Sequence, residues 1–201
     1  ALIIINRVKI AKTENIEIAA KNVKSGLLEK AFDCAETAHE GQTWKLPDGS
    51  DTSYFEGHLM GVYKILKEEG SVDEQMLITA LLHDTIEDTK ITYEDIEKQF
   101  GRDIADNVKW LSKEHGVPYE DYIDELLKNG SDTAVIVKLA DRLHNTRNLM
   151  NMGSEKWHEK KITQAEYMMD KFTERKVDEK YEKVKEKLIS YIKNGIDDVS
   201  N

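Results

Sequence analysis

Four ionisable side chains directly follow the most apolar stretch of the 201-residue chain, which covers residues 76–82. They are His83, Asp84, Glu87 and Asp88. If the helix predicted there continued, His83 and Glu87 would share one face, and the two aspartates would share the neighbouring face. Burying so many ionisable groups together is costly unless something pairs them. A divalent cation held by part of this set would pair them.

A second group of polar side chains lies on a helix predicted over residues 135–149. Asp141, Asn145 and Asn148 occupy positions i, i+4 and i+7 of this helix, so they share one face. Lys138 lies one turn before Asp141, where it can act as a salt-bridge partner. This face therefore offers one more carboxylate for a cation.

A further candidate ligand, His58, stands at the start of the predicted helix that carries Val62 and Ile65. Two imidazoles and two carboxylates can then be grouped as one set: His58, His83, Asp84 and Asp141. Such a nitrogen and oxygen set suits an octahedral first-row metal with positions left for water or substrate. A metal with an open position lowers the pKa of its water and polarises a phosphoryl oxygen.

Two carboxylates remain outside this ligand set. Glu87 and Asp88 lie one turn beyond the His83-Asp84 dipeptide, so they can serve as general acid or base on that water or on the leaving group. The glycine-rich phosphate loops, the HExxH motif and the GxSxG motif are absent from the sequence. Metal-assisted hydrolysis is the chemistry that the pattern favours.

Helices must position these residues, because most apolar residues repeat with helical spacing. Three expected helices cover residues 25–39, residues 103–111 and the segment from Pro118 to Asn129. Another helix begins at a cap formed by Thr92 with Asp95 and ends at Gly101. A further helix begins at a cap formed by Ser131 or Asp132. The polar segment from Thr43 to Thr52 reads as a surface loop. We expect one all-α domain over residues 1–201.

The last predicted helix, over about residues 177–193, carries one apolar stripe: Val177, Tyr181, Val184, Leu188 and Tyr191. The other faces carry Lys and Glu, so the helix is expected to pack one side on the body of the domain. A homodimer seam along this stripe is the alternative.

Composition excludes several classes of protein. The 11 Gly and 2 Pro are too few for a fibrous or turn-dense chain, and the net charge of −10 disfavours nucleic-acid and membrane-surface partners. A single cysteine, Cys34, excludes an intrachain disulfide and fits a cytoplasmic setting. The run Leu2–Ile5 is too short for a signal-peptide core, and no apolar stretch is long enough for a membrane span.

The order of the four candidate ligands, H…HD…D, resembles the HD-domain superfamily of metal-dependent phosphohydrolases. Four ordered boxes bring the resemblance to one branch: residues 38–45 (AHEGQTWK), residues 80–89 (ALLHDTIEDT), Phe100-Gly101 and residues 138–145 (KLADRLHN). This branch comprises the (p)ppGpp hydrolase domains of the RelA/SpoT group and their stand-alone small relatives. The resemblance covers about residues 25–170 and implies a single-domain helical bundle.

The resemblance implies a Mn²⁺-dependent enzyme that removes the 3′-pyrophosphate from the nucleotide (p)ppGpp. By motif position, the metal ligands would be His58, His83, Asp84 and Asp141. Glu87 and Asp88 would activate or position the attacking water. Lys45, Asn145 and Lys161 would contact the nucleotide.

Several positions depart from the pattern of the family. Trp44 replaces an Arg that lies against the purine, and Asn148 replaces a Thr. The Tyr that the family places three residues before the first metal histidine is Phe55 here, with Tyr54 beside it. An indole at position 44 could stack on the base or be a plain core aromatic. Two alternatives therefore stay open: hydrolysis of another nucleotide phosphate, such as ppApp or NADPH, and a non-catalytic nucleotide-sensing domain.

Overall fold

A computed structural model describes residues 26–70, 72–149 and 153–200 of the chain. The run Leu2–Ile5 and residue Ser25, the first residue of the first predicted helix, lie outside the described residues. The described elements are a helix over residues 26–38, strands β1 (Thr43–Lys45) and β2 (Asp51–Ser53), the π-helix η1 (Phe55–Leu59), and helices α2 (Met60–Glu69), α3 (Glu74–Leu82), α4 (Thr85–Asp88), α5 (Tyr93–Phe100), α6 (Arg102–Leu111), α7 (Tyr119–Asn129), α8 (Asp132–Arg147), α9 (Glu155–Glu174) and α10 (Glu179–Ser200). The expected all-α class is confirmed, with one small sheet added.

That sheet corrects the prediction of a plain surface loop between Thr43 and Thr52. β1 and β2 pair antiparallel, with Trp44 opposite Thr52. The turn between them is held by Asp48, whose side chain accepts hydrogen bonds from the amide and the hydroxyl of Ser50. The hairpin therefore holds Trp44 in a regular strand against the helices.

A helix break also corrects the expected arrangement around His83. α3 ends at Leu82, His83 and Asp84 form a turn, and α4 begins at Thr85. The Thr85 hydroxyl donates to the carbonyl of Leu82 at 2.5 Å, which helps to close the turn. His83 and Glu87 therefore do not share the face of one continuous helix.

Capping signals located the other helices closely. Thr92 and Asp95 form the predicted capping box before α5, and Gly101 ends that helix with φ of +90°. Ser131 is the N-cap of α8, its hydroxyl accepting from the amide of Ala134. Two helix bounds differ from the predicted ones by one or two residues. α6 begins at Arg102, and α8 ends at Arg147, before Leu149.

The C-terminal region contains more helix than the sequence indicated. α9 was not predicted, and α10 begins after Val177 and continues to Ser200, beyond the expected end at residue 193. The stripe of α10 packs on the body as expected, because Tyr181, Val184 and Leu188 are buried, whereas Tyr191 is 39 % exposed. These buried positions are not available as a dimer seam.

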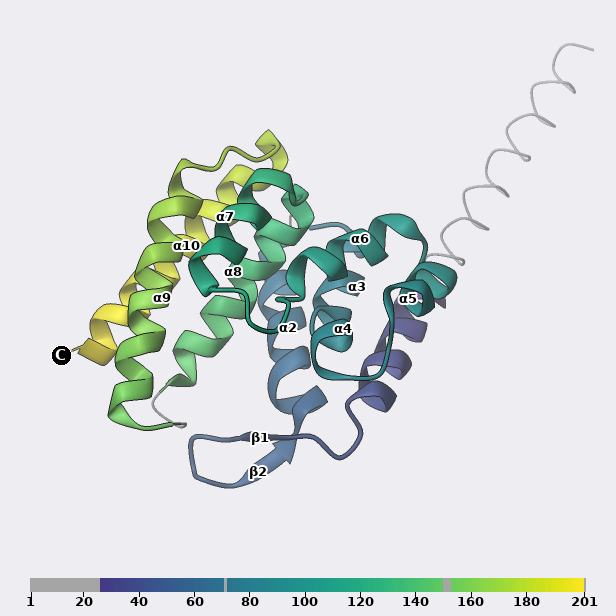
Figure 1. The fold of residues 1–201 in the computed structure, drawn as a ribbon, viewed down its shortest axis with the longest axis horizontal. Helices are drawn as coiled ribbons and strands as arrows, with labels where there is room; N and C mark the ends of the chain where they lie inside the picture. Colours follow the sequence, from purple (N-terminus) through teal and green to yellow (C-terminus); the bar gives the residue numbers. More distant parts are fainter. Residues whose placement is uncertain (1–25, 71, 150–152, 201) are drawn as a thin grey trace, which may run out of the picture.

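The core consists of two apolar clusters that meet at α2 and α3. The larger cluster gathers residues of α7, α8, α9 and α10, and the smaller one lies between the helix over residues 26–38, α5 and α6. α8 contacts α2, α3, α6, α7 and α10, so it runs through the middle of the bundle (Figure 1). No helix in the described ranges is long and apolar enough to cross a membrane.

Candidate active site

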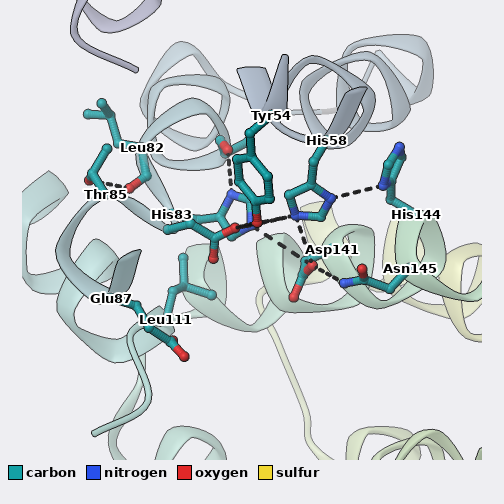
Figure 2. A network of polar contacts seen from close by, with 12 residues as sticks. Tyr54, His58, Leu82, His83, Thr85, Glu87, Leu111, Asp141, His144 and Asn145 are labelled. Atoms are coloured by element: carbon teal, nitrogen blue, oxygen red, sulfur yellow. Dashed lines mark hydrogen bonds and ion pairs between the residues drawn. The ribbon is translucent and has the colours of Figure 1, made fainter. Parts of the chain in front are cut away.

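Three segments that are distant in sequence bring the four predicted metal ligands together, and Figure 2 labels three of them: His58, His83 and Asp141. His58 comes from η1, the dipeptide His83-Asp84 from the turn after α3, and Asp141 from the middle of α8. The His58 Nε2 atom lies 3.3 Å from His83 Nε2 and 3.3 Å from Asp84 Oδ2. Asp141 Oδ1 lies 3.5 Å from the same His58 nitrogen. One small volume therefore collects two ring nitrogens and two carboxylate oxygens.

The outer contacts of the His83 ring define which nitrogen it can offer. His83 Nδ1 lies 2.8 Å from the carbonyl oxygen of Ala80, and a carbonyl only accepts hydrogen bonds. Nδ1 therefore carries a proton, and Nε2, which lies 3.0 Å from Asp84 Oδ2, is the nitrogen that faces the carboxylates. The carboxylates attract positive charge to this nitrogen, and a divalent cation bound between the ring and the carboxylates would supply it. The donor set thus fits a divalent metal.

The charges of the site lead to the same conclusion. Burial alone would lower the pKa of His58, but hydrogen bonds and charges from Asp141 and Asp84 raise it to about 9. Burial alone would raise the pKa of Asp84, yet the neighbouring imidazoles hold it well below its usual range. The buried carboxylates therefore keep their negative charge and favour a positive group at the ring nitrogens.

Tyr54, not Phe55, supplies the aromatic hydroxyl of the site. Its hydroxyl donates to Asp84 Oδ2 at 2.6 Å, and its ring stacks on His39 with centroids 5.0 Å apart. Phe55 instead packs its ring edge-to-face with Phe32 in the core. Phe55 begins the π-turn of η1, which contains one residue more than an α-helical turn. This wider turn explains why the residue four positions before His58 faces the ligands.

Asp141 has a different partner on each of its oxygens. Lys138 Nζ donates to Oδ2 at 2.9 Å, while Asn145 Nδ2 donates to Oδ1 at 2.5 Å. Burial alone would lower the pKa of Lys138, but Asp141 raises it well above its usual value. Lys138 therefore stays charged and fixes the carboxylate on which the metal site depends.

A cavity of about 380 Å³ opens beside Asp141 and Asn145. Its walls carry four basic side chains from two helices and a loop: Lys113, Lys138, Arg142 and Lys161. The walls also carry apolar side chains, which include Leu149, Trp157 and Ile196. Burial and the charge of Arg142 lower the pKa of Lys161, so an anion bound here would relieve the repulsion between the two cations. The cavity suits a phosphorylated molecule with an apolar or aromatic part.

The two predicted acid–base residues face different cavities. Glu87 lines the cavity beside Asp141, and its Oε2 accepts from the backbone amide of Lys113 at 2.7 Å. Desolvation raises the pKa of Glu87, although the hydrogen bond from Lys113 opposes it. Asp88 lines a second cavity, between the helix over residues 26–38 and α5. Glu87 is therefore the better placed of the two for proton transfer in the first cavity.

Three of the five residues predicted to contact the nucleotide line the cavity beside Asp141, and two do not. Trp44, Asn145 and Lys161 line the cavity beside Asp141. Lys45 is exposed and pairs with Asp51 at 3.1 Å. Asn148 follows the last turn of α8, where its side chain donates to the carbonyl of His144 at 2.8 Å. Neither Lys45 nor Asn148 lines that cavity.

Some cavity residues were not identified from the sequence. Arg142 lines the cavity and donates to the hydroxyl of Tyr119 at 2.8 Å. Its position next to Asp141 was the available signal. Lys113 lies in the loop after α6, and no pattern in the sequence connects it with the ligands.

Comparisons with known proteins agree with this geometry. The family model described as "HD domain" matches residues 31–168. The chain is 35% identical over 142 residues to the guanosine-3′,5′-bis(diphosphate) 3′-pyrophosphohydrolase MESH1 of Xenopus tropicalis, covering 69% of this chain and 78% of that protein. It is 37% identical over 139 residues to MESH1 of Homo sapiens, covering 67% and 76% of the two chains.

A longer relative and a solved structure complete the comparison. The bifunctional (p)ppGpp synthase/hydrolase SpoT of Escherichia coli (strain K12) is 35% identical over 138 residues, which are 64% of this chain and 19% of SpoT. A structure described as a metazoan ortholog of SpoT that hydrolyzes ppGpp superposes with a TM-score of 0.68 at 26% identity. That superposition covers 84% of this chain and 94% of the other.

Proposed function

Because the chain belongs to the HD domain family, among relatives of the MESH1 type, we propose that it is a metal-dependent hydrolase that releases pyrophosphate from the 3′ position of (p)ppGpp. The observation that carries the proposal is the convergence of His58, His83, Asp84 and Asp141 beside a cavity walled by basic side chains. This arrangement places a cation site and an anion site next to each other.

The proposed reaction needs a water activated next to a phosphoryl group. A divalent ion, which we propose to be Mn²⁺, would lower the pKa of that water and polarise the phosphoryl oxygen. The oxygen of the water forms a bond to the phosphorus on the ribose 3′-oxygen, the bond from this phosphorus to O3′ breaks, and pyrophosphate leaves. The ribose oxygen takes up a proton, so GDP is the other product when the substrate is ppGpp.

The residues of this chain divide the remaining work. Glu87 accepts the proton of the water or returns it to the ribose oxygen, since it lines the same cavity as Asp141. Lys138, Arg142 and Lys161 hold the phosphates, because they form the basic wall of that cavity. Asp88 remains a predicted second acid–base residue, and Lys45 and Asn148 remain predicted nucleotide contacts.

The same chemistry on another nucleotide phosphate is the second candidate function. The position of Lys45 outside the cavity and the burial of Trp44 favour it, because Lys45 was expected to contact the nucleotide and Trp44 replaces an Arg that lies against the purine. ppApp and NADPH are the compounds to compare. A cytoplasmic location, a homodimer and the inclusion of all 201 residues in one domain remain predictions.

The experiment measures product release by the purified chain with Mn²⁺ on ppGpp, pppGpp, ppApp and NADPH. We expect pyrophosphate from ppGpp and its loss in Glu87→Ala and Asp141→Asn, with Lys64→Ala, an exposed position of α2, as the unaffected control. Release from another compound alone would transfer the proposal to that substrate. Nucleotide binding without turnover of any of the four would support the sensing alternative and contradict the enzyme.

A further inference from the structure

We propose that Trp44 and His144 are positioning residues that hold the ring of His58 in the orientation and tautomer needed for metal binding. We further propose that Gly57 and Gly61 are required to make room for them. The proposal rests on the proposed function in one respect: it concerns the metal site on which that function depends. It adds a support for the ligand that neither the ligand motif nor the comparisons assign.

His144 determines which nitrogen of His58 carries the proton. The Nδ1 atoms of the two rings lie 3.0 Å apart in a buried contact, so one of them donates and the other accepts (Figure 2). His58 can offer its Nε2 lone pair to a metal only when its proton is on Nδ1. His144 Nδ1 must then be the acceptor, with its own proton on Nε2. Hydrogen bonds of this kind orient ligand histidines and increase their basicity.

α8 carries both His144, which contacts the His58 ring, and the predicted metal ligand Asp141. His144 lies three positions after Asp141, so the two side chains lie on neighbouring turns of one face of α8. Asp141 approaches His58 Nε2 at 3.5 Å, while His144 contacts the opposite nitrogen of the same ring. A shift of α8 relative to η1 would therefore disturb both contacts at once.

Trp44 determines the plane of the His58 ring. The two rings are stacked, with centroids 4.7 Å apart and planes 24° from parallel. Trp44 is 7 % exposed and belongs to β1, where it lies opposite Thr52 in the hairpin. The hairpin thus presses one indole face against the imidazole, which leaves that face unavailable for stacking on a base.

Two glycines on either side of His58 make this arrangement sterically feasible. A Cβ atom at Gly57 would lie 2.6 Å from Trp44 Cβ and 2.7 Å from its Cδ1. A Cβ atom at Gly61 would overlap the His144 ring atoms Nε2 and Cδ2. Both glycines have helical backbone and neither has a positive φ, so close packing, and not backbone freedom, is the reason for glycine.

The test measures the Mn²⁺ affinity of the full chain without substrate, by electron paramagnetic resonance of free Mn²⁺. His144→Leu keeps bulk and removes the acceptor, whereas His144→Asn keeps an acceptor close to the position of Nδ1. We expect Leu to weaken Mn²⁺ binding about 10- to 100-fold, the usual effect of losing such a partner, and Asn to restore most of it. Equal affinities in the wild type and the Leu variant, or equal losses in both variants, would overturn the proposal.

Trp44 is tested in the same assay with Trp44→Phe and Trp44→Ala. Phe keeps a flat ring against His58 and is expected to stay within about 3-fold of the wild-type affinity, while Ala removes the ring and is expected to lose 10-fold or more, on the scale seen for other residues that orient a ligand. An Ala variant with wild-type affinity would show that the stack does not position His58. Because these measurements contain no nucleotide, they remain informative if ppGpp is not hydrolysed.

A measurement on the wild-type chain covers the case in which a variant does not fold. With Zn²⁺ as a diamagnetic probe, long-range ¹H–¹⁵N NMR reports which imidazole nitrogens carry protons. We expect the proton of His58 on Nδ1 and that of His144 on Nε2. A proton on Nδ1 of His144 would contradict the proposed hydrogen bond.

Discussion

At the scale of single residues, the two aspartates of the site are held by hydrogen bonds from neutral and charged neighbours. Tyr54 donates to Asp84 at 2.6 Å, and Lys138 donates to Asp141 at 2.9 Å. Such bonds to a carboxylate stabilise its charged form and fix its orientation. These hydrogen bonds therefore hold both carboxylates of the proposed metal site in place.

The bond from Tyr54 has a measurable effect on stability. We expect Tyr54→Phe to lower the free energy of unfolding by about 1.5–3 kcal/mol, the range for a hydrogen bond to a charged group. The measurement is urea unfolding in the presence of a chelator. Tyr167→Phe is the matched control, because its hydroxyl donates to Asp124 on the exposed surface at 2.8 Å. Equal effects of the two substitutions would mean that the hydrogen bond from Tyr54 contributes no more to the free energy of unfolding than the exposed one from Tyr167.

Glu87 provides the second prediction at this scale. Glu87→Gln keeps an oxygen that can accept from the amide of Lys113 but removes the charge and the basicity. We expect kcat to fall by about 10²- to 10⁴-fold, the usual contribution of a general acid or base, with the Mn²⁺ affinity unchanged. Asp88→Asn is expected to lose less, since Asp88 lines the other cavity. A larger loss in Asp88→Asn would reverse the assignment of the two roles.

At the scale of elements, the site depends on a hairpin, a π-turn and a helix break that no helical periodicity predicts. The helices themselves follow from spacing and caps, as Thr92 and Ser131 illustrate. The order of the ligand residues also allowed His58, His83, Asp84 and Asp141 to be grouped, and the structure brings these four side chains together. The turn at His83 was missed because hydrophobic spacing does not record side-chain hydrogen bonds, such as the one from Thr85 to the carbonyl of Leu82. For the same reason, the sequence could not show that Tyr54 and not Phe55 reaches Asp84.

The close contact between α2 and α8 leads to a prediction with an unusual sign. Replacing a helical Gly by Ala normally stabilises a helix by up to about 1 kcal/mol. At Gly61 the added methyl group meets the buried His144 ring, so we expect Gly61→Ala to destabilise the chain by about 1–3 kcal/mol, the usual cost of overpacking. Gly26→Ala, where no described atom lies within 4 Å of the added Cβ, is the control for thermal unfolding. A stabilised Gly61→Ala variant would show that α2 and α8 separate easily.

At the scale of the whole molecule, an acidic chain encloses a basic cavity. The net charge is −10, yet Lys113, Lys138, Arg142 and Lys161 gather at one place. The composition disfavours polyanionic partners such as nucleic acids as a first expectation, but it could not locate this cavity. The basic side chains come from α8, α9 and the loop after α6, so only the folded arrangement of these segments creates an anion site.

The most direct test of the central claim is removal and return of the metal during ppGpp turnover. The chain is stripped with a chelator and dialysed, and pyrophosphate release is then followed while Mn²⁺ is added. We predict that turnover is absent in the stripped chain, returns as one equivalent of Mn²⁺ binds, and does not return in Asp141→Asn. Full turnover by the stripped chain, or equal recovery in Asp141→Asn, would contradict the assignment of these residues as the metal site of a hydrolase.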